Sequence, residues 1–305
     1  MAILSRYPGL TVNVKVDNEL AKEYDAPEEE VEAGSEKWEF HKLNSRLRGG
    51  TPYSLSYIEA KPGKPFEFVI DTRCINLYGG EKPEAFQVTA SLDGYHTSLL
   101  LGNENYTFRK CYTGNPTTGY SESKFKFASL DILEGPVPAN DIKRQVEEAK
   151  HYGTLLIELH LVRRIPGRSR PYLPRDAPNS SVMGIAEKAL KGKAVDTKTT
   201  FNSKRITGTM YSATVEYSDP KSRPFAVFEF RYRTMEGLIR EAIVPRPAEV
   251  IDVEEEYIRI KRIKPEIEDA PRGIKREPMD PDQFAARYKQ RRLEDGKVEI
   301  DLTDD

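Results

Sequence analysis

The chain has 305 residues, of which 38% are hydrophobic and 31% are charged. A hydrophobic share this low predicts that part of the chain packs into no core. Two cysteines are too few for a disulfide framework, no apolar run reaches membrane-spanning length, and the first ten residues lack a secretory signal, so we expect a soluble intracellular protein without membrane contact.

The net charge of −2 hides two opposite blocks. Asp17–Glu36 contains nine acids and one base, whereas His160–Arg205 contains eleven bases and three acids. These blocks therefore carry about −8 and +8, and either one could contact the other or an external partner.

The first part of the chain reads as β-strands. Leu10–Val16 alternates apolar and polar residues, which predicts a half-buried strand. Glu23–Lys37 is acidic and contains Pro27 and Gly34, so we expect a mobile surface loop there. Asp93-Gly94 lies between two alternating segments and is the strongest hairpin signal. Strands are expected at Tyr53–Ala60, Pro65–Asp71, Phe86–Leu92, Tyr95–Leu101, Tyr106–Tyr112, Ser123–Leu130 and Thr154–Val162.

Helices are expected at three places. Asn140–Lys150 is predicted to be a short helix with Asn140 as its N-cap. The basic region 163–205 is expected to contain a loop at Arg163–Pro178 and a helix at Val182–Lys191. After a strand at Met210–Tyr217, the segment Arg223–Arg246 predicts a buried strand, then a helix capped by Thr234, with Ala242 on its apolar face and Pro245 as its stop.

Short strands at roughly ten-residue spacing predict a mainly β fold, an antiparallel β-sandwich-like domain with two or three short helices, over residues 1–246. From Arg246 onward, thirty of sixty residues are charged. Such a segment cannot bury enough apolar surface to offset its ordering entropy. We therefore expect residues 247–305 to be a disordered C-terminal tail.

Several short segments together resemble an uncharacterised fungal family of unknown function, over about Gly9–Arg246. The resemblance implies a fungal origin and a compact β-rich domain, and it brings no activity. Relatives often carry Ser-His after a Lys-Gly-Lys-Ala segment, but Val195-Asp196-Thr197 stands there in this chain. The segments are Gly9–Val14, Glu23–Asp25, Tyr57–Ala60, Leu92–Gly94, Phe125–Phe127, Tyr152–Thr154, Glu187–Ala194, Pro224–Arg233 and Pro245-Arg246.

Motifs of catalysis are missing from the sequence. No glycine loop for phosphates, nucleophile elbow or dinucleotide fingerprint is present. The four histidines and two cysteines lack zinc-ligand spacing. We therefore expect a non-enzymatic protein with no catalytic residue, cofactor or metal; the alternative is an enzyme whose site arises only when the fold brings distant residues together.

The basic stretch allows two interpretations. Its cations would attract phosphates or nucleic acid, with Tyr172 available to stack on a base. Alternatively, they are solvated side chains that complement the acidic loop of the same chain. The candidate contacts are Arg163, Arg164, Arg168, Arg170, Arg175, Lys191 and Lys193.

The tail contains two acceptor patterns for the ubiquitin-like modifier SUMO. Ile263-Lys264-Pro265-Glu266 and Ile274-Lys275-Arg276-Glu277 both read hydrophobic-Lys-x-Glu. A conjugating enzyme needs an extended, accessible lysine, which unfolded chain supplies. Lys264 and Lys275 are therefore the predicted acceptors.

Two acidic segments resemble SUMO-interacting motifs, in which an extended apolar segment adds a strand to a sheet edge and its acids face a basic rim. The alternative is a few apolar residues in an acidic tail, or, for Val250–Ile260, an extension of the sheet. The terminal motif has Val298, Ile300, Leu302, Asp304 and Asp305, and the other has Val250, Ile251 and Val253.

The sequence thus favours a protein whose tail binds SUMO or sumoylated proteins, or is itself modified, in the nucleus or in both nucleus and cytoplasm. Weak import signals at Lys261–Lys264 and Arg287–Arg292 agree with that location, and the alternative is that both clusters are ordinary solvated charge. The alternative function is phosphate or nucleic-acid binding through residues 163–193.

Overall fold

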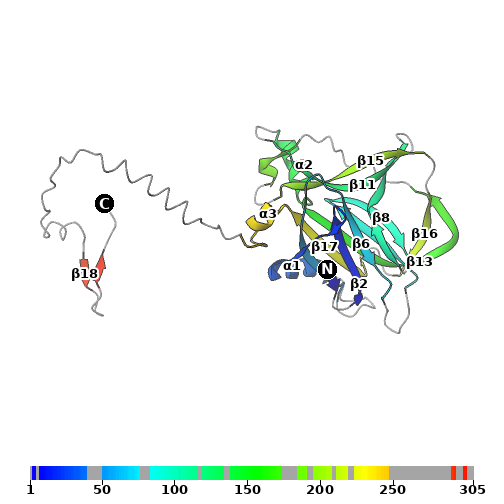
Figure 1. The fold of residues 1–305 in the computed structure, drawn as a ribbon, viewed down its shortest axis with the longest axis horizontal. Coiled ribbons are helices and arrows are strands. Elements are labelled where there is room, and N and C mark those ends of the chain that lie inside the picture. Colours follow the sequence, from blue (N-terminus) through cyan, green and yellow to red (C-terminus); the bar gives the residue numbers. More distant parts are fainter. Residues whose placement is uncertain are drawn as a thin grey trace. The chain divides into compact units, whose positions relative to one another are not determined.

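The computed structural model describes residues 2–4, 7–39, 50–75, 83–102, 104–115, 119–133, 138–172, 184–190, 195–207, 211–218, 223–246, 290–292 and 298–300. The chain divides into two compact units, Met1–Arg246 and Pro247–Asp305. The first unit is mainly β and has three α-helices among its described residues, which confirms the predicted fold class (Figure 1). None of the helices in the described ranges is long and apolar enough to cross a membrane.

Strand β17 (Ala226–Arg233) lies inside the largest sheet, between the parallel strand β5 (Tyr53–Glu59) and the antiparallel strand β13 (Thr154–Pro171). Its Val227 and Phe228 are fully buried, and because successive side chains point to opposite faces, both faces of the strand are covered. The remaining members of this sheet are β4 (Glu23–Asp25), β7 (Ala85–Leu92), β8 (Tyr95–Leu101) and β16 (Tyr211–Tyr217).

Two smaller sheets form the second layer of the sandwich. Phe127 of the second layer packs on Tyr232 of β17 with ring centroids 4.8 Å apart, and both residues belong to one hydrophobic core. The first of these two smaller sheets contains β1 (Ala2–Leu4), β2 (Tyr7–Val16), β3 (Glu19–Leu20), β6 (Phe66–Asp71) and β9 (Asn105–Phe108). The second sheet contains β10 (Lys110–Asn115), β11 (Gly119–Ser129) and β15 (Thr197–Ile206). A short parallel pair, β12 (Ile132–Leu133) and β14 (Ile185–Ala186), lies outside both.

Two local predictions are confirmed in detail. The alternating side chains of β2, from Leu10 to Val16, are buried at every second position. Asp93 and Gly94 join β7 to β8 with positive φ angles of 49° and 85°, the backbone of a tight hairpin turn.

The predicted acidic loop is wrong. Glu23–Asp25 is strand β4, and helix α1 spans Glu28–Glu39. Three glutamates in the first turn, Glu28 to Glu30, favour this helix because they face the positive end of its dipole. Gly34 lies inside this helix and does not end it. Glycine is required at this position because a β-carbon would collide with the ring of Tyr53.

The predicted basic loop is also wrong over the part that the structure describes. Strand β13 does not end at Val162 but continues to Pro171, and its second half pairs with β16. The pairing register shifts between Arg164 and Ser169, which accommodates Pro166 and Gly167 within a long strand. Figure 1 shows this extension at the end of the sandwich opposite α3.

The predicted helices need smaller corrections. Helix α2 spans Ala139–Ala149 with Pro138, and not Asn140, at the N-cap. Instead of a helix at Val182–Lys191, the described residues form β14 and a 3₁₀ turn at Glu187–Leu190. Helix α3 spans Met235–Arg240, so it ends before Ala242, whose φ of 58° is not helical.

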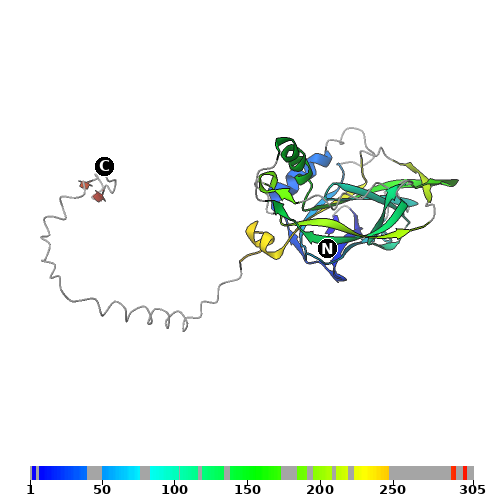
Figure 2. The ribbon, with the colours of Figure 1, turned by 90° about the horizontal axis from the view of Figure 1, so that it is seen from above.

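The N-cap of α3 is as predicted, because the side chain of Thr234 accepts a 3.2 Å hydrogen bond from the amide of Gly237. Helices α1, α2 and α3 gather at one end of the sandwich in both views (Figures 1 and 2).

Within residues 247–305 the structure describes two short strands. β18 (Gln290–Arg292) and β19 (Val298–Ile300) pair antiparallel. The other residues of the predicted disordered tail lie outside the described part of the chain.

Candidate functional site

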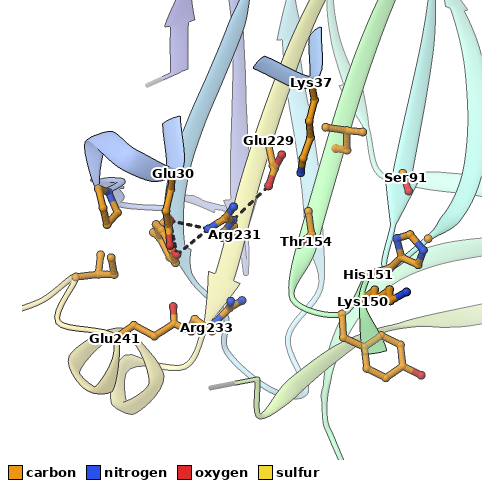
Figure 3. Close-up of a pocket in the computed structure, with 16 residues that line it drawn as sticks. Glu30, Lys37, Ser91, Lys150, His151, Thr154, Glu229, Arg231, Arg233 and Glu241 are labelled. Atoms are coloured by element: carbon orange, nitrogen blue, oxygen red, sulfur yellow. Dashed lines mark hydrogen bonds and ion pairs between the residues drawn. The ribbon is translucent and has the colours of Figure 1, made fainter. Parts of the chain in front are cut away.

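A charged pocket of 590 Å³ lies at the helical end of the sandwich. Glu30 and Lys37 of α1 line this pocket together with Arg231 and Arg233 of β17 (Figure 3). Glu241, which directly follows α3, also lines it. The pocket therefore combines acids and bases from elements that are distant in sequence.

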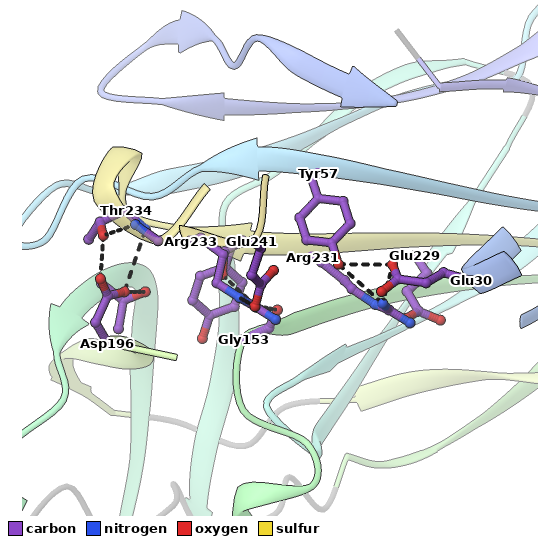
Figure 4. A network of polar contacts seen from close by, with 12 residues as sticks. Glu30, Tyr57, Gly153, Asp196, Glu229, Arg231, Arg233, Thr234 and Glu241 are labelled. Atoms are coloured by element: carbon purple, nitrogen blue, oxygen red, sulfur yellow. Dashed lines mark hydrogen bonds and ion pairs between the residues drawn. The ribbon is translucent and has the colours of Figure 1, made fainter. Parts of the chain in front are cut away.

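The acids of the pocket already neutralise Arg231. Its guanidinium donates to Glu30 at 2.6 Å and to Glu229 at 3.2 Å (Figure 4). Tyr57 donates to the same carboxylate of Glu30 at 2.9 Å, and Tyr53 donates to Glu229 at 2.9 Å. This network ties α1 to β5 and β17.

Arg233 is 7% exposed and is equally committed. It donates to Glu241 at 2.9 Å, to the carbonyl of Gly153 at 2.9 Å and to the carbonyl of Tyr232 at 2.8 Å (Figure 4). These bonds fix the residues after α3 against the turn before β13. Because both arginines are satisfied within the protein, the pocket is better explained as a structural joint than as an anion site.

Among the described residues, no group of three His, Cys, Asp or Glu side chains could hold a metal ion.

A different surface carries an excess of positive charge among the described residues: the outward face of the sheet β10–β11–β15. In this sheet Lys110 pairs with Lys124, Glu122 pairs with Lys204, and Ala128 pairs with Lys198. Partners in register share a face, and alternate residues along a strand do too. The lysines on this face are Lys110, Lys124, Lys126, Lys198 and Lys204, and the acid in register with them is Glu122.

Glu122 lies among these charges and feels several of them. A 2.7 Å hydrogen bond from Lys110 holds the pKa of Glu122 below its usual value, and the charges of Lys124 and Lys204 act in the same direction. One glutamate thus balances one of five lysines. We name this surface, with Arg109 at its margin, the basic face.

A hollow of 400 Å³ lies within the basic face. Arg109, Lys124 and Lys126 line it together with Asn202, and Glu67 of the neighbouring strand β6 is the acid in its lining. Lys124 and Asn202 are directly opposite one another in register, and both are exposed. Three cations and an amide around one hollow suit a phosphate group.

The arginines singled out from the sequence lie elsewhere. Arg163, Arg164 and Arg168 are exposed on the second half of β13. Arg163 lies 3.7 Å from Glu84, and the amide of Arg164 donates to the same carboxylate. Among the residues the structure describes, no ion pair joins these arginines to the acidic segment. For Arg170 the structure describes the backbone, which belongs to β13, but not the side chain. The remaining candidates, Arg175, Lys191 and Lys193, lie outside the described residues.

For the tail motifs, the structure describes the backbone of Val298 and Ile300 in strand β19. Outside the described residues are Leu302, Asp304, Asp305, Val250, Ile251, Val253, Lys264 and Lys275.

Sequence reasoning missed the basic face because its members come from three separate strands. A local signal did exist, since Lys124 and Lys126 alternate with the buried Phe125 and Phe127. That alternation predicts two lysines on an outward face, but only the register adds Lys110, Lys198 and Lys204.

The fold and this surface define a β-sandwich domain with a basic outer sheet. The chain belongs to the family described as Domain of unknown function (DUF7918), whose match covers residues 9–247. This confirms the family resemblance, while the fungal origin stays a prediction. No curated protein and no solved structure matches the chain.

Proposed function

We propose that this domain is a binding module, not an enzyme, and that its basic face binds single-stranded nucleic acid. The observation that carries the proposal is the cross-strand register, which places five lysines on one face of β10–β11–β15 against one glutamate. A surface of this kind attracts a phosphate backbone and releases counterions when it binds.

The pairing of Lys110 with Lys124 argues against ordinary solvated charge. Like charges directly opposite one another destabilise a sheet. Glu122 relieves Lys110 but leaves Lys124, Lys126 and Lys204 without an ion pair among the described side chains. A polyanion laid across the sheet would relieve that repulsion.

A single strand fits this surface better than a duplex. The face is a sheet of three strands, too broad to enter a groove of DNA, and it carries the half-buried Tyr112 and Tyr120 beside the lysines. Aromatic side chains on an open sheet stack unpaired bases, while nearby cations hold the phosphates.

The test uses the full chain and a fluorescent ten-nucleotide strand, with binding followed by anisotropy at low salt. Replacing Lys124 and Lys126 by Ala should weaken binding by about tenfold or more, because each hydrogen bond to a charged group is worth about 1.5 kcal/mol or more. The control replaces Lys143 and Lys188, two exposed lysines away from the basic face, and removes the same charge. Equal losses in both variants would show that binding follows net charge and not this surface.

We propose a second function for the tail: recognition of SUMO by strand addition at Val298–Asp305. The extended backbone of β19 supports it, since this is the conformation that strand addition requires. Within the described residues β19 pairs with β18 on one edge, so its other edge is open to a partner strand.

Titration of isotope-labelled SUMO with the full chain tests this second proposal. We expect an affinity on the order of micromolar to tens of micromolar, because ordering a free segment offsets much of the gain from burying its apolar anchors. Ile300→Ala with Leu302→Ala should abolish the resonance shifts, and Asp304→Ala with Asp305→Ala should weaken them mainly at low salt. Shifts that persist in the apolar double variant would refute the assignment.

Lys264 and Lys275 are the proposed acceptors of SUMO, and a nuclear location is proposed with them. In a reconstituted conjugation reaction, Lys264→Arg with Lys275→Arg should remove the modification. Undiminished conjugation of that variant would place the acceptor elsewhere.

A further inference from the structure

A groove of 860 Å³ adjoins the basic face. It lies between the edge strand β8, strand β10 and the β13–β16 extension. Among its lining residues are one cation, Lys110, and no acid. Its walls are rich in tyrosine: Tyr106, Tyr112, Tyr172, Tyr211 and Tyr217.

The tyrosines differ in how firmly they are held. Tyr112 and Tyr172 meet edge to face, with ring centroids 6.5 Å apart and an interplanar angle of 77°. Tyr217 is fixed against His160 in the same manner, at 5.6 Å. Tyr106 is 37% exposed and Tyr211 is 66% exposed, so both rings at the rim of the groove are accessible to a ligand.

We infer that this groove receives unpaired bases of the nucleic acid whose backbone lies on the basic face. The inference rests on the function proposed above. Lys110 and Tyr112 connect the two sites, because they line the groove and also lie on the outward face of β10.

The chemistry of the lining favours a base over other occupants. Phenol rings stack on any base, and the exposed faces of Tyr106 and Tyr211 provide such contacts. The volume lies in the range of small-molecule pockets, so it holds one or two rings and not a folded partner. The lack of acids in the lining removes repulsion from the phosphates that accompany a base.

The deciding experiment compares two labelled strands that have equal numbers of phosphates, ten thymidines and ten abasic sugars. Both bind the full chain at low salt, and the thymidine strand binds about tenfold or more tightly, as expected when at least one base stacks. Tyr106→Ala with Tyr211→Ala lowers thymidine binding to the abasic level and leaves abasic binding unchanged. Tyr106→Phe with Tyr211→Phe keeps the rings and therefore retains the preference. The unchanged abasic binding of the alanine variant excludes a general loss of folding.

The outcomes separate the two claims. Equal affinity for both strands, with binding still weakened by Lys124→Ala and Lys126→Ala, overturns the groove and keeps the basic face. Failure of the wild-type chain to bind either strand overturns the proposed function and the groove with it. A preference for thymidine that survives the double alanine variant also overturns the groove.

Discussion

The hydroxyl of Tyr232 donates a 2.5 Å hydrogen bond to Oδ2 of Asp93, across 139 residues of sequence. Asp93 belongs to the β7–β8 turn, and Tyr232 lies in β17, so the bond joins a hairpin tip to the central strand. The same carboxylate accepts hydrogen bonds from the amides of Gly153 and Thr154 and from both the amide and the hydroxyl of Thr199. Burial raises the pKa of Asp93, and these donors oppose the rise.

Tyr232→Phe removes one donor from this buried carboxyl and should lower the free energy of unfolding by about 1.5–3 kcal/mol. Urea denaturation of the full chain measures it. Tyr24→Phe is the matched control, since Tyr24 lies on the edge strand β4 and is only partly buried. A change below about 0.5 kcal/mol in the Tyr232 variant would mean that the bond contributes little to stability.

Arg231→Met tests whether the charged pocket is a structural joint. The variant leaves Glu30 and Glu229 without their shared cation, so we expect a loss of about 1–3 kcal/mol in unfolding free energy. Arg240→Met on α3 changes an exposed arginine and should have little effect. If nucleic-acid affinity fell in Arg231→Met while stability did not, the pocket would belong to the binding site.

The two cysteines should react at very different rates. Cys111 is 3% exposed, and burial raises the pKa of its thiol to about 12, whereas Cys74 is exposed. A disulfide-exchange reagent at pH 8 should therefore modify one thiol in the native chain and the second only in denaturant. Rapid labelling of native Cys74→Ser would contradict the burial of Cys111.

Stability should fall in alkaline solution. Burial raises the pKa of Tyr53, Tyr57 and Tyr232 in the folded chain, whereas unfolded tyrosine loses its proton near pH 10. Above that pH the unfolded state binds fewer protons than the folded state, so the free energy of unfolding decreases as pH rises. Urea midpoints between pH 8 and 11 measure the slope, and Tyr53→Phe should reduce it. An unchanged slope in that variant would contradict the raised pKa of Tyr53.

The sequence predicted well those features that depend on near neighbours. Alternation in Leu10–Val16 and the Asp93-Gly94 pair are sufficient for a strand and a hairpin, because side-chain period and positive φ are local properties. The same local patterns were enough for the sandwich class. They failed for α1, where acidic composition suggested a loop although Glu28–Glu30 stabilise a helix start.

Features that depend on register could not be predicted. Strand β13 continues past Val162 because β16 supplies backbone partners for Arg163 to Pro171. The basic face likewise exists only because β10, β11 and β15 align their lysines, which are up to 94 residues apart in the chain, from Lys110 to Lys204. Pattern alone specified which way Lys124 and Lys126 point, but not which strands lie beside them.

The dependence of nucleic-acid affinity on salt tests the basic face most directly. Five cations without an ion pair among the described side chains, Arg109, Lys124, Lys126, Lys198 and Lys204, should give a slope of log affinity against log salt of about −3.5 for a single strand. Lys124→Ala with Lys126→Ala should reduce the slope to about −2. The same slope in both proteins, or no binding at low salt, would contradict the assignment of this surface.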